Sequence, residues 1–158
     1  MASATDTTPP RTTEPCPGLR LQGAAELFQA MPPLGGLVMG RPTPGQHCLD
    51  FLHQLASGQT PEEALTFMAF ALLARQAVWW GHECLKAVPE LLTGQDHEMM
   101  ALIGPWVARN DDDSRYAALE AGLRAEVHGP GVWLALGAGG AGGSISGRGV
   151  PPGPPPGG

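Results

Sequence analysis

The sequence predicts an all-α fold, an irregular bundle of about six helices in antiparallel hairpins. Apolar side chains recur at helical spacing, capping residues precede several of these segments, and no segment alternates polar and apolar residues as a strand would. Glycine and proline gather towards the ends of the 158-residue chain. We therefore expect a disordered tail over residues 1–18, a helical domain over 19–136 and a Gly/Pro-rich tail over 137–158.

The first helices are separated by a loop rich in glycine and proline. Residues 23–31 form an amphipathic pattern that stops at two consecutive prolines, and residues 45–56 carry leucines at helical spacing. The next helix, over 60–73, begins with a capping box in which Thr60 is the N-cap and Glu63 lies three residues later. Its second half is apolar on nearly every side, so we expect it to be the most buried helix.

Three further helical segments follow. Residues 75–88 complete a hairpin with 60–73, and residues 96–108 contain a Gly-Pro pair that should kink or split the helix. Three consecutive aspartates, residues 111–113, are placed to cap the N-terminus of the next helix, which should end at a second Gly-Pro pair. Residues 132–136 are compatible with one last helical turn or with a strand.

One member of the adjacent pair Trp79 and Trp80 points away from the apolar side of its helix. At 100° per residue, Trp80 lies on the apolar face and Trp79 on the polar face. A large aromatic there is either covered by the chain's own tail, such as residues 150–156, or offered to another protein. Trp80, Trp106 and Trp133 are expected in the core. The candidate protein contacts on the polar face are Trp79, Arg75, His82, Glu83 and Lys86.

No residue pattern predicts a catalytic, cofactor or metal site. The glycines of residues 137–142 match a dinucleotide-binding pattern, but no helix that could hold a pyrophosphate follows. His82 and Cys84 diverge on a helix and cannot hold one metal ion together. His47 and Cys48 also diverge, and no third group orients them as base and nucleophile. We expect both cysteines to be small core residues and predict no enzyme activity.

Composition and charge restrict the partners. The formal net charge is −6 and the nine basic residues are scattered singly, which argues against nucleic acid. The longest apolar run is well short of a membrane span, and the N-terminus lacks the apolar centre of a secretory signal. Three widely spaced cysteines indicate neither a disulfide scaffold nor a zinc ribbon. We expect a soluble, cytoplasmic protein with a protein partner and without nucleic acid, membrane or cofactor.

The most distinctive segment is TPEEALTFMAFALLARQAVWW, residues 60–80, which ends in an Ala-Val-Trp-Trp motif. Shorter segments accompany it at residues 106–107, 115–118, 133–135, 142–144 and 150–152. On these residues the chain resembles an uncharacterised bacterial family of small helical proteins, often encoded near type VI secretion loci. The resemblance implies an accessory role near a secretion machine, with no known activity or site residue to carry over.

Two functions of different classes follow as hypotheses. The first is a non-catalytic accessory or adaptor protein that acts through the helical surface around Trp79. The alternative is a small-ligand-binding or hydrolytic helical domain with an interhelical pocket near His82 and Glu83.

Overall fold

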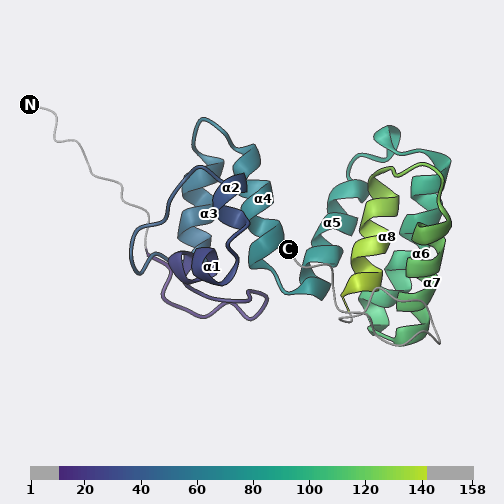
Figure 1. The fold of residues 1–158 in the computed structure, drawn as a ribbon, viewed down its shortest axis with the longest axis horizontal. Helices are drawn as coiled ribbons and strands as arrows, with labels where there is room; N and C mark the ends of the chain where they lie inside the picture. Colours follow the sequence, from purple (N-terminus) through teal and green to yellow (C-terminus); the bar gives the residue numbers. More distant parts are fainter. Residues whose placement is uncertain (1–10, 142–158) are drawn as a thin grey trace, which may run out of the picture. The chain divides into compact units, whose positions relative to one another are not determined.

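The computed structural model describes residues 11–141, which form helices and the loops between them (Figure 1). Within this range there are eight α-helices, one short 3-10 helix and an isolated bridge between Gly23 and His47. The predicted all-α class is confirmed. The chain divides into two compact units, Met1–Ala71 and Leu72–Gly158, which are described separately.

Parts of both predicted tails lie outside the described residues. These parts are residues 1–10 and 142–158. Gly142, the last glycine of the dinucleotide-binding pattern, therefore lies outside the described residues. So do residues 150–156, which were predicted as one possible cover of Trp79. The division into one domain between two tails stays a prediction.

The first unit is built around three phenylalanine rings. α3 and α4 pack on each other, and α2 packs on α4. The rings of Phe28, Phe51 and Phe67 lie with their centroids 4.9 to 6.3 Å apart. Phe51 and Phe67 are fully buried. The helices of this unit are α1 (Ala24–Ala30), α2 (Leu34–Leu37), α3 (Cys48–Ala56) and α4 (Glu62–Ala71).

The start of α4 differs from the predicted capping box. Glu63 does not fold back to Thr60; its Oε2 accepts hydrogen bonds from the backbone N–H groups of Met39 at 3.0 Å and Gly40 at 3.1 Å. This carboxylate therefore ties α4 to the segment that follows α2. The residues that donate to Glu63 lie more than twenty positions earlier in the chain. A capping pattern involves only neighbouring residues, so it does not predict this contact.

The second unit has α8 at its centre. Figure 1 shows α8 between α5 and α6, and it packs on α5, α6 and α7. The core includes Val78, Ile103, Trp106 and Val132. Five residues of α8 are buried, whereas only three of α4 are. The prediction that α4 is the most buried helix is therefore wrong. The elements of this unit are α5 (Ala74–Lys86), the 3-10 helix η1 (Pro89–Leu91), α6 (Gly94–Arg109), α7 (Asp112–Arg124) and α8 (Pro130–Gly140).

The boundary between the units falls between two helices that the sequence pairs as a hairpin. α4 belongs to the first unit and α5 to the second. Phe67 on α4 is buried among the phenylalanine rings, whereas Val78 on α5 is buried in the core that α6 and α8 share. Each helix therefore buries its apolar side in its own unit, and two cores replace the single core expected for that hairpin.

Helix α8 comes from a glycine-rich segment, and it continues to Gly140, past the predicted start of the tail at residue 137. Residues 132–136 are thus helical. A Cβ added at Gly139 would lie 2.5 Å from the Cβ of Leu119 on α7, so glycine is needed for this close approach. Glycine costs about 1 kcal/mol relative to alanine inside a helix. Packing against α7 offsets that cost, which local propensity does not reveal.

α6 is continuous through the Gly-Pro pair that was expected to kink or split it. Pro105 has no N–H to donate to the carbonyl of Ala101, and Ala101 is an exposed residue. The predicted aspartate cap is confirmed, because the side chain of Asp111 accepts a hydrogen bond from the Ser114 N–H at 2.8 Å. α7 ends at Arg124, and the second Gly-Pro pair begins α8 instead of ending α7.

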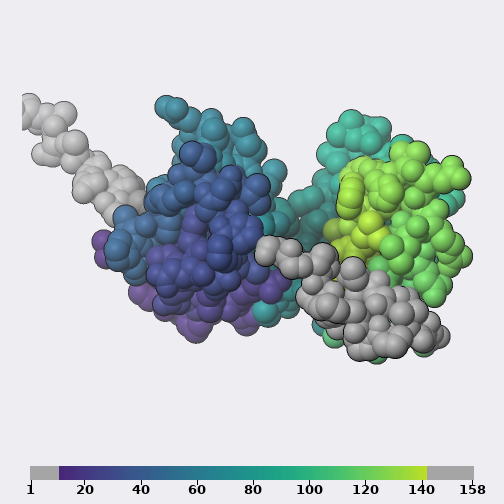
Figure 2. Space-filling model, viewed as in Figure 1, coloured from purple at the N-terminus to yellow at the C-terminus, as the bar shows by residue number. Residues whose placement is uncertain are grey.

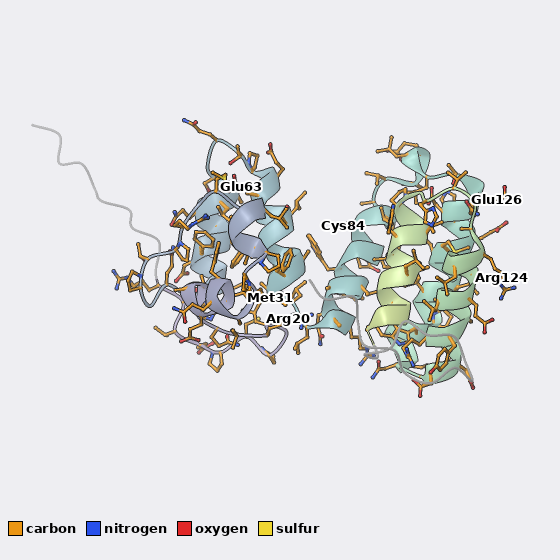
Figure 3. All side chains as sticks on the ribbon, in the orientation of Figure 1. Arg20, Met31, Glu63, Cys84, Arg124 and Glu126 are labelled. Atoms are coloured by element: carbon orange, nitrogen blue, oxygen red, sulfur yellow. The ribbon has the colours of Figure 1, made fainter. Side chains whose placement is uncertain are left out.

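Several burial predictions need correction. Trp106 is buried as expected, but Trp80 is only half-buried and Trp133 is 63% exposed. Part of α8 reaches the surface, as the yellow-green atoms of the second unit show in Figure 2, and the Trp133 ring lies 5.2 Å from that of His128. Cys84, expected in the core, is exposed (Figure 3). An apolar stripe on one helix does not specify which of its residues a neighbouring helix covers.

Candidate functional site

Four side chains form a stripe along α5, which we call the Trp79 surface. At 100° per residue their positions lie within about 60° of one another around the helix axis. Another side of α5 faces inward, where Val78 is buried and a Cβ on Gly81 would lie 2.9 Å from Leu134 of α8. The stripe consists of Arg75, Trp79, His82 and Lys86.

Trp79 is 52% exposed and borders a hollow of about 230 Å³ that Arg75, Gln76 and Val107 also line. Arg75 donates hydrogen bonds to the carbonyl of Val107, from Nε at 3.1 Å and from Nη2 at 2.7 Å, and from Nη2 to that of Ala108 at 3.2 Å. Carbonyls in the last turn of a helix lack N–H partners within it. Arg75 therefore caps the C-terminal end of α6 and is held in place beside Trp79.

The next turns of α5 carry the other predicted contact residues. His82 is half-buried; its Nε2 lies 3.3 Å from the carbonyl oxygen of Met100 on α6, and its Nδ1 lies 3.5 Å from Glu83 Oε1. Lys86 Nζ donates to both carboxylate oxygens of Glu83, at 3.1 and 3.2 Å. The hydrogen bond from Lys86, aided by His82, holds the pKa of Glu83 below its usual value. Glu83 and Lys86 thus pair at the surface, while His82 is anchored to α6.

The contribution of α6 to this surface was not predicted from the sequence. A second hollow of about 300 Å³ lies beside His82, and its lining includes Leu85 of α5 with His97 and Met100 of α6. The sequence signal that could have indicated it is a second stripe, on α6, with the same i, i+4, i+7, i+11 spacing as the stripe on α5. Only the packing of α5 on α6 reveals that two hollows lie along the seam between these helices. The stripe on α6 consists of His97, Ala101, Gly104 and Ala108.

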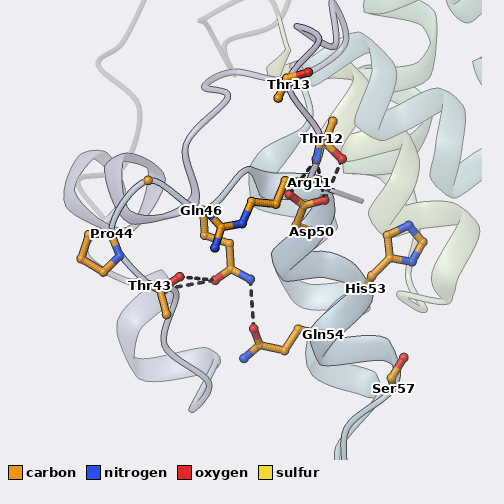
Figure 4. Close-up of a pocket in the computed structure, with 11 residues that line it drawn as sticks. Arg11, Thr12, Thr13, Thr43, Pro44, Gln46, Asp50, His53, Gln54 and Ser57 are labelled. Atoms are coloured by element: carbon orange, nitrogen blue, oxygen red, sulfur yellow. Dashed lines mark hydrogen bonds between the residues drawn. The ribbon is translucent and has the colours of Figure 1, made fainter. Parts of the chain in front are cut away.

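The first unit contains a larger hollow, of about 630 Å³, that the sequence analysis did not predict (Figure 4). Residues 11–13, which belong to the predicted first tail, form one wall. Thr12 anchors them by donating from its backbone N–H to Asp50 at 3.0 Å and from Oγ1 at 2.6 Å, and these bonds lower the pKa of Asp50. The side-chain amide of Gln46 donates to that of Gln54 at 3.0 Å. These polar groups bind one another, which favours a structural role for them.

His47 and Cys48 are not arranged as base and nucleophile. His47 Nδ1 accepts a hydrogen bond from the Leu49 N–H at 3.1 Å and so caps α3. Cys48 is buried, as predicted, and its Sγ donates to the carbonyl of Leu21 at 3.4 Å. Burial, reinforced by the charge of Glu26, raises the pKa of the Cys48 thiol to about 11. The thiol is therefore protonated at neutral pH and a poor nucleophile.

Residues 11–141 contain no group of three His, Cys, Asp or Glu side chains that could hold a metal ion. Each fully buried side-chain nitrogen or oxygen in this part of the chain has a hydrogen-bond partner. None of the helices described above is both long enough and apolar enough to cross a bilayer.

The chain belongs to the family described as "Family of unknown function (DUF6931)", whose model matches residues 51–158. The match covers more than half of the chain and includes every helix from α4 to α8. Both hollows along the seam between α5 and α6 therefore lie within the matched region. No curated protein and no solved structure matches the chain.

Proposed function

We propose that this member of the DUF6931 family is a non-catalytic accessory or adaptor protein that binds a protein partner through the Trp79 surface. The observation that carries the proposal is the half-exposed indole of Trp79, which stands between two side chains already held by α6, Arg75 and His82. Tryptophan and arginine are enriched among the residues that dominate binding energy in protein interfaces.

The size of the exposed indole fits such a role. A tryptophan buries roughly 200 Å² when fully covered, and Trp79 is 52% exposed. A partner that covers the indole would therefore remove about 100 Å² of its surface from water. At about 25 cal/mol per Å², this burial contributes about 2.5 kcal/mol to the binding free energy. Because Arg75 and His82 are held before binding, ordering them costs little further entropy. This free energy is that of an interface hot spot.

We further propose that the protein acts in the bacterial cytoplasm and that its partner is a component of a type VI secretion machine. The support is the resemblance to helical proteins encoded near such loci. A nucleic-acid partner is disfavoured by the net charge of −6 and the scattered basic residues.

A specific observation supports the alternative of a small-ligand-binding domain. The 300 Å³ hollow beside His82 has an apolar lining of Leu85, Leu92 and Met100 with imidazoles at its edge. The residues that line it include no Ser, Thr, Cys, Asp or Glu side chain to serve as a nucleophile. The lining of this hollow therefore supports binding of a small ligand better than it supports hydrolysis.

The test is the substitution Trp79→Ala. We expect it to weaken partner binding about 30-fold, which corresponds to about 2 kcal/mol, because the partner loses the indole surface. The free energy of unfolding should change by less than about 1 kcal/mol, as at other surface sites. Tagged full-length protein would capture secretion components from a bacterial lysate, and titration of the purified partner would give the dissociation constant.

Trp133→Ala is the matched control, because Trp133 is an equally large and even more exposed aromatic of the same unit. It should leave partner binding unchanged. Capture that is insensitive to Trp79→Ala, or equally sensitive to both substitutions, would contradict a role for the Trp79 surface.

A further inference from the structure

The Trp79 surface is one side of a groove between two antiparallel helices. Arg75 bonds the carbonyl of Ala108 near one end, and His82 lies against Met100 further along. Lys86 and His97 both line the hollow at the other end. We call the two hollows, one bordered by Trp79 and the other by His82, the α5–α6 groove. From Arg75 to Lys86 it extends about 16 Å at 1.5 Å per residue, or about three helical turns.

The two sides of the groove differ in bulk. The α5 side carries arginine, tryptophan, histidine and lysine, whereas the α6 stripe carries His97 at one end and beyond it only Ala101, Gly104 and Ala108. A Cβ added at Gly104 would meet a single neighbouring atom, His82 Nε2, at 3.8 Å, so the space above this glycine is open. A side chain from a partner can therefore pass over α6 beside His82.

The charge of the α5–α6 groove is opposite in sign to that of the chain. The residues that line its two hollows include Arg75 and Lys86, with two imidazoles, and no carboxylate. The formal net charge of the whole chain is −6. At physiological ionic strength charges are screened over about 8 Å. Within this distance Glu83 pairs with Lys86 at 3.1 Å, so a carboxylate of the partner competes with Glu83 for Lys86. The bonds of Arg75 are to backbone carbonyls, which leave its charge unneutralised.

Both cations remain able to bind a partner. The bonds of Arg75 to α6 use Nε and Nη2, and its side chain is exposed, so Nη1 can still donate. Lys86 is paired with Glu83 in the open, with 57% and 43% of the two side chains exposed. Exposed pairs of this kind contribute little to stability. Lys86 can therefore exchange Glu83 for a carboxylate of the partner.

Building on the proposed function, we propose that the partner places an acidic amphipathic helix in the α5–α6 groove. An apolar side chain of that helix covers Trp79, and its carboxylates bind Arg75 and Lys86. A helix fits better than an extended strand, because residues 11–141 offer no sheet edge that an incoming strand could extend. Grooves between helices accept the side-chain ridges of a third helix.

The probe is a pair of synthetic, fluorescently labelled peptides of about 18 residues, long enough for five helical turns. Both carry leucine at the same i, i+3, i+4, i+7 spacing, and the remaining positions are glutamate and glutamine in one and lysine and glutamine in the other. Anisotropy titrations with the full chain should give at least about tenfold tighter binding of the acidic peptide. This preference should shrink at high salt.

Substitutions locate the binding site. The double change Arg75→Gln with Lys86→Gln should weaken binding of the acidic peptide about tenfold, and Trp79→Ala should weaken it at least as much. Arg124→Gln is the matched control, because Arg124 is an exposed cation on α7 whose charge is also paired with a glutamate (Figure 3). It should leave binding unchanged. Circular dichroism would establish that each variant remains helical.

Equal binding of the two peptides, or equal weakening by Arg124→Gln, would overturn the acidic-helix assignment. So would rejection of both peptides with binding to phosphatidylglycerol vesicles, which would indicate a membrane surface as the occupant. If partner capture depends on Trp79 while the peptides show no charge preference, this inference fails and the proposed function stands. Partner capture that does not depend on Trp79 refutes the proposed function whatever the peptides do.

Discussion

Phe67→Ala is expected to destabilise the first unit by about 3–5 kcal/mol, the usual range for a buried phenylalanine. Phe67 is fully buried, and its ring lies 4.9 Å from that of Phe51 in an edge-to-face arrangement. The substitution removes both the buried apolar area and this ring contact, and a unit this small has few other large side chains to close the cavity. Urea unfolding followed by circular dichroism would measure the loss.

Leu65→Ala provides the control on the same helix. Leu65 is 59% exposed, so its truncation should change the free energy of unfolding by less than about 0.5 kcal/mol. All four tryptophans of the chain lie in the second unit, so their fluorescence reports unfolding of that unit. A loss below about 1 kcal/mol for Phe67→Ala would place the core of the first unit elsewhere.

Asp96→Ala is expected to destabilise the second unit by about 3 kcal/mol or more, because one buried carboxylate serves two helices. Asp96 is 1% exposed; its Oδ2 accepts hydrogen bonds from the backbone N–H of Thr93 at 3.0 Å and from its Oγ1 at 2.9 Å. Its Oδ1 accepts from the Gly131 N–H of α8 at 2.8 Å. Alanine would leave the buried Gly131 N–H unpaired, at about 1–3 kcal/mol. It would also remove the Asp96 half of the capping box at Thr93, at about 0.5–2 kcal/mol.

Tryptophan fluorescence during urea unfolding would measure this loss, with Glu98→Ala as the control. Glu98 is an exposed carboxylate on the same helix, so its removal should change stability by less than about 0.5 kcal/mol. Asp96→Asn keeps the shape and one acceptor oxygen, and its effect should be intermediate. Wild-type stability in Asp96→Ala would show that the two helix ends are held by other contacts.

The same carboxylate makes stability depend on pH. Desolvation raises the pKa of Asp96, but the hydrogen bonds from Thr93, Gly131 and Val132 outweigh it and hold the pKa below its usual value. The folded state therefore binds the proton more weakly than the unfolded state. This stabilisation is fully present above the unfolded value of about 4 and is lost as the pH falls through the lower, folded value. Urea titrations between neutral and acidic pH should give a shallower loss for Asp96→Asn than for the wild type.

Local sequence determined the helical class, the aspartate cap at Asp111 and the orientation of Trp79. Each of these follows from residues within a few positions of one another, because helical periodicity and capping act over one or two turns. The exposed indole agrees with the angle calculated from the sequence. The sequence also placed all five predicted contact residues on one helix.

Tertiary structure alone decided which helices share a core and what surrounds Trp79. The glycine-rich α8 is central because Gly139 lets its backbone approach Leu119 closely. The packing free energy of this contact is not part of the helix propensity of glycine. Asp96 acquires a second partner, Gly131, thirty-five residues later in the chain. The α6 side of the groove likewise exists only once α5 has packed against it. These features depend on pairs of residues far apart in sequence, and their free energy appears only when packing brings both members together.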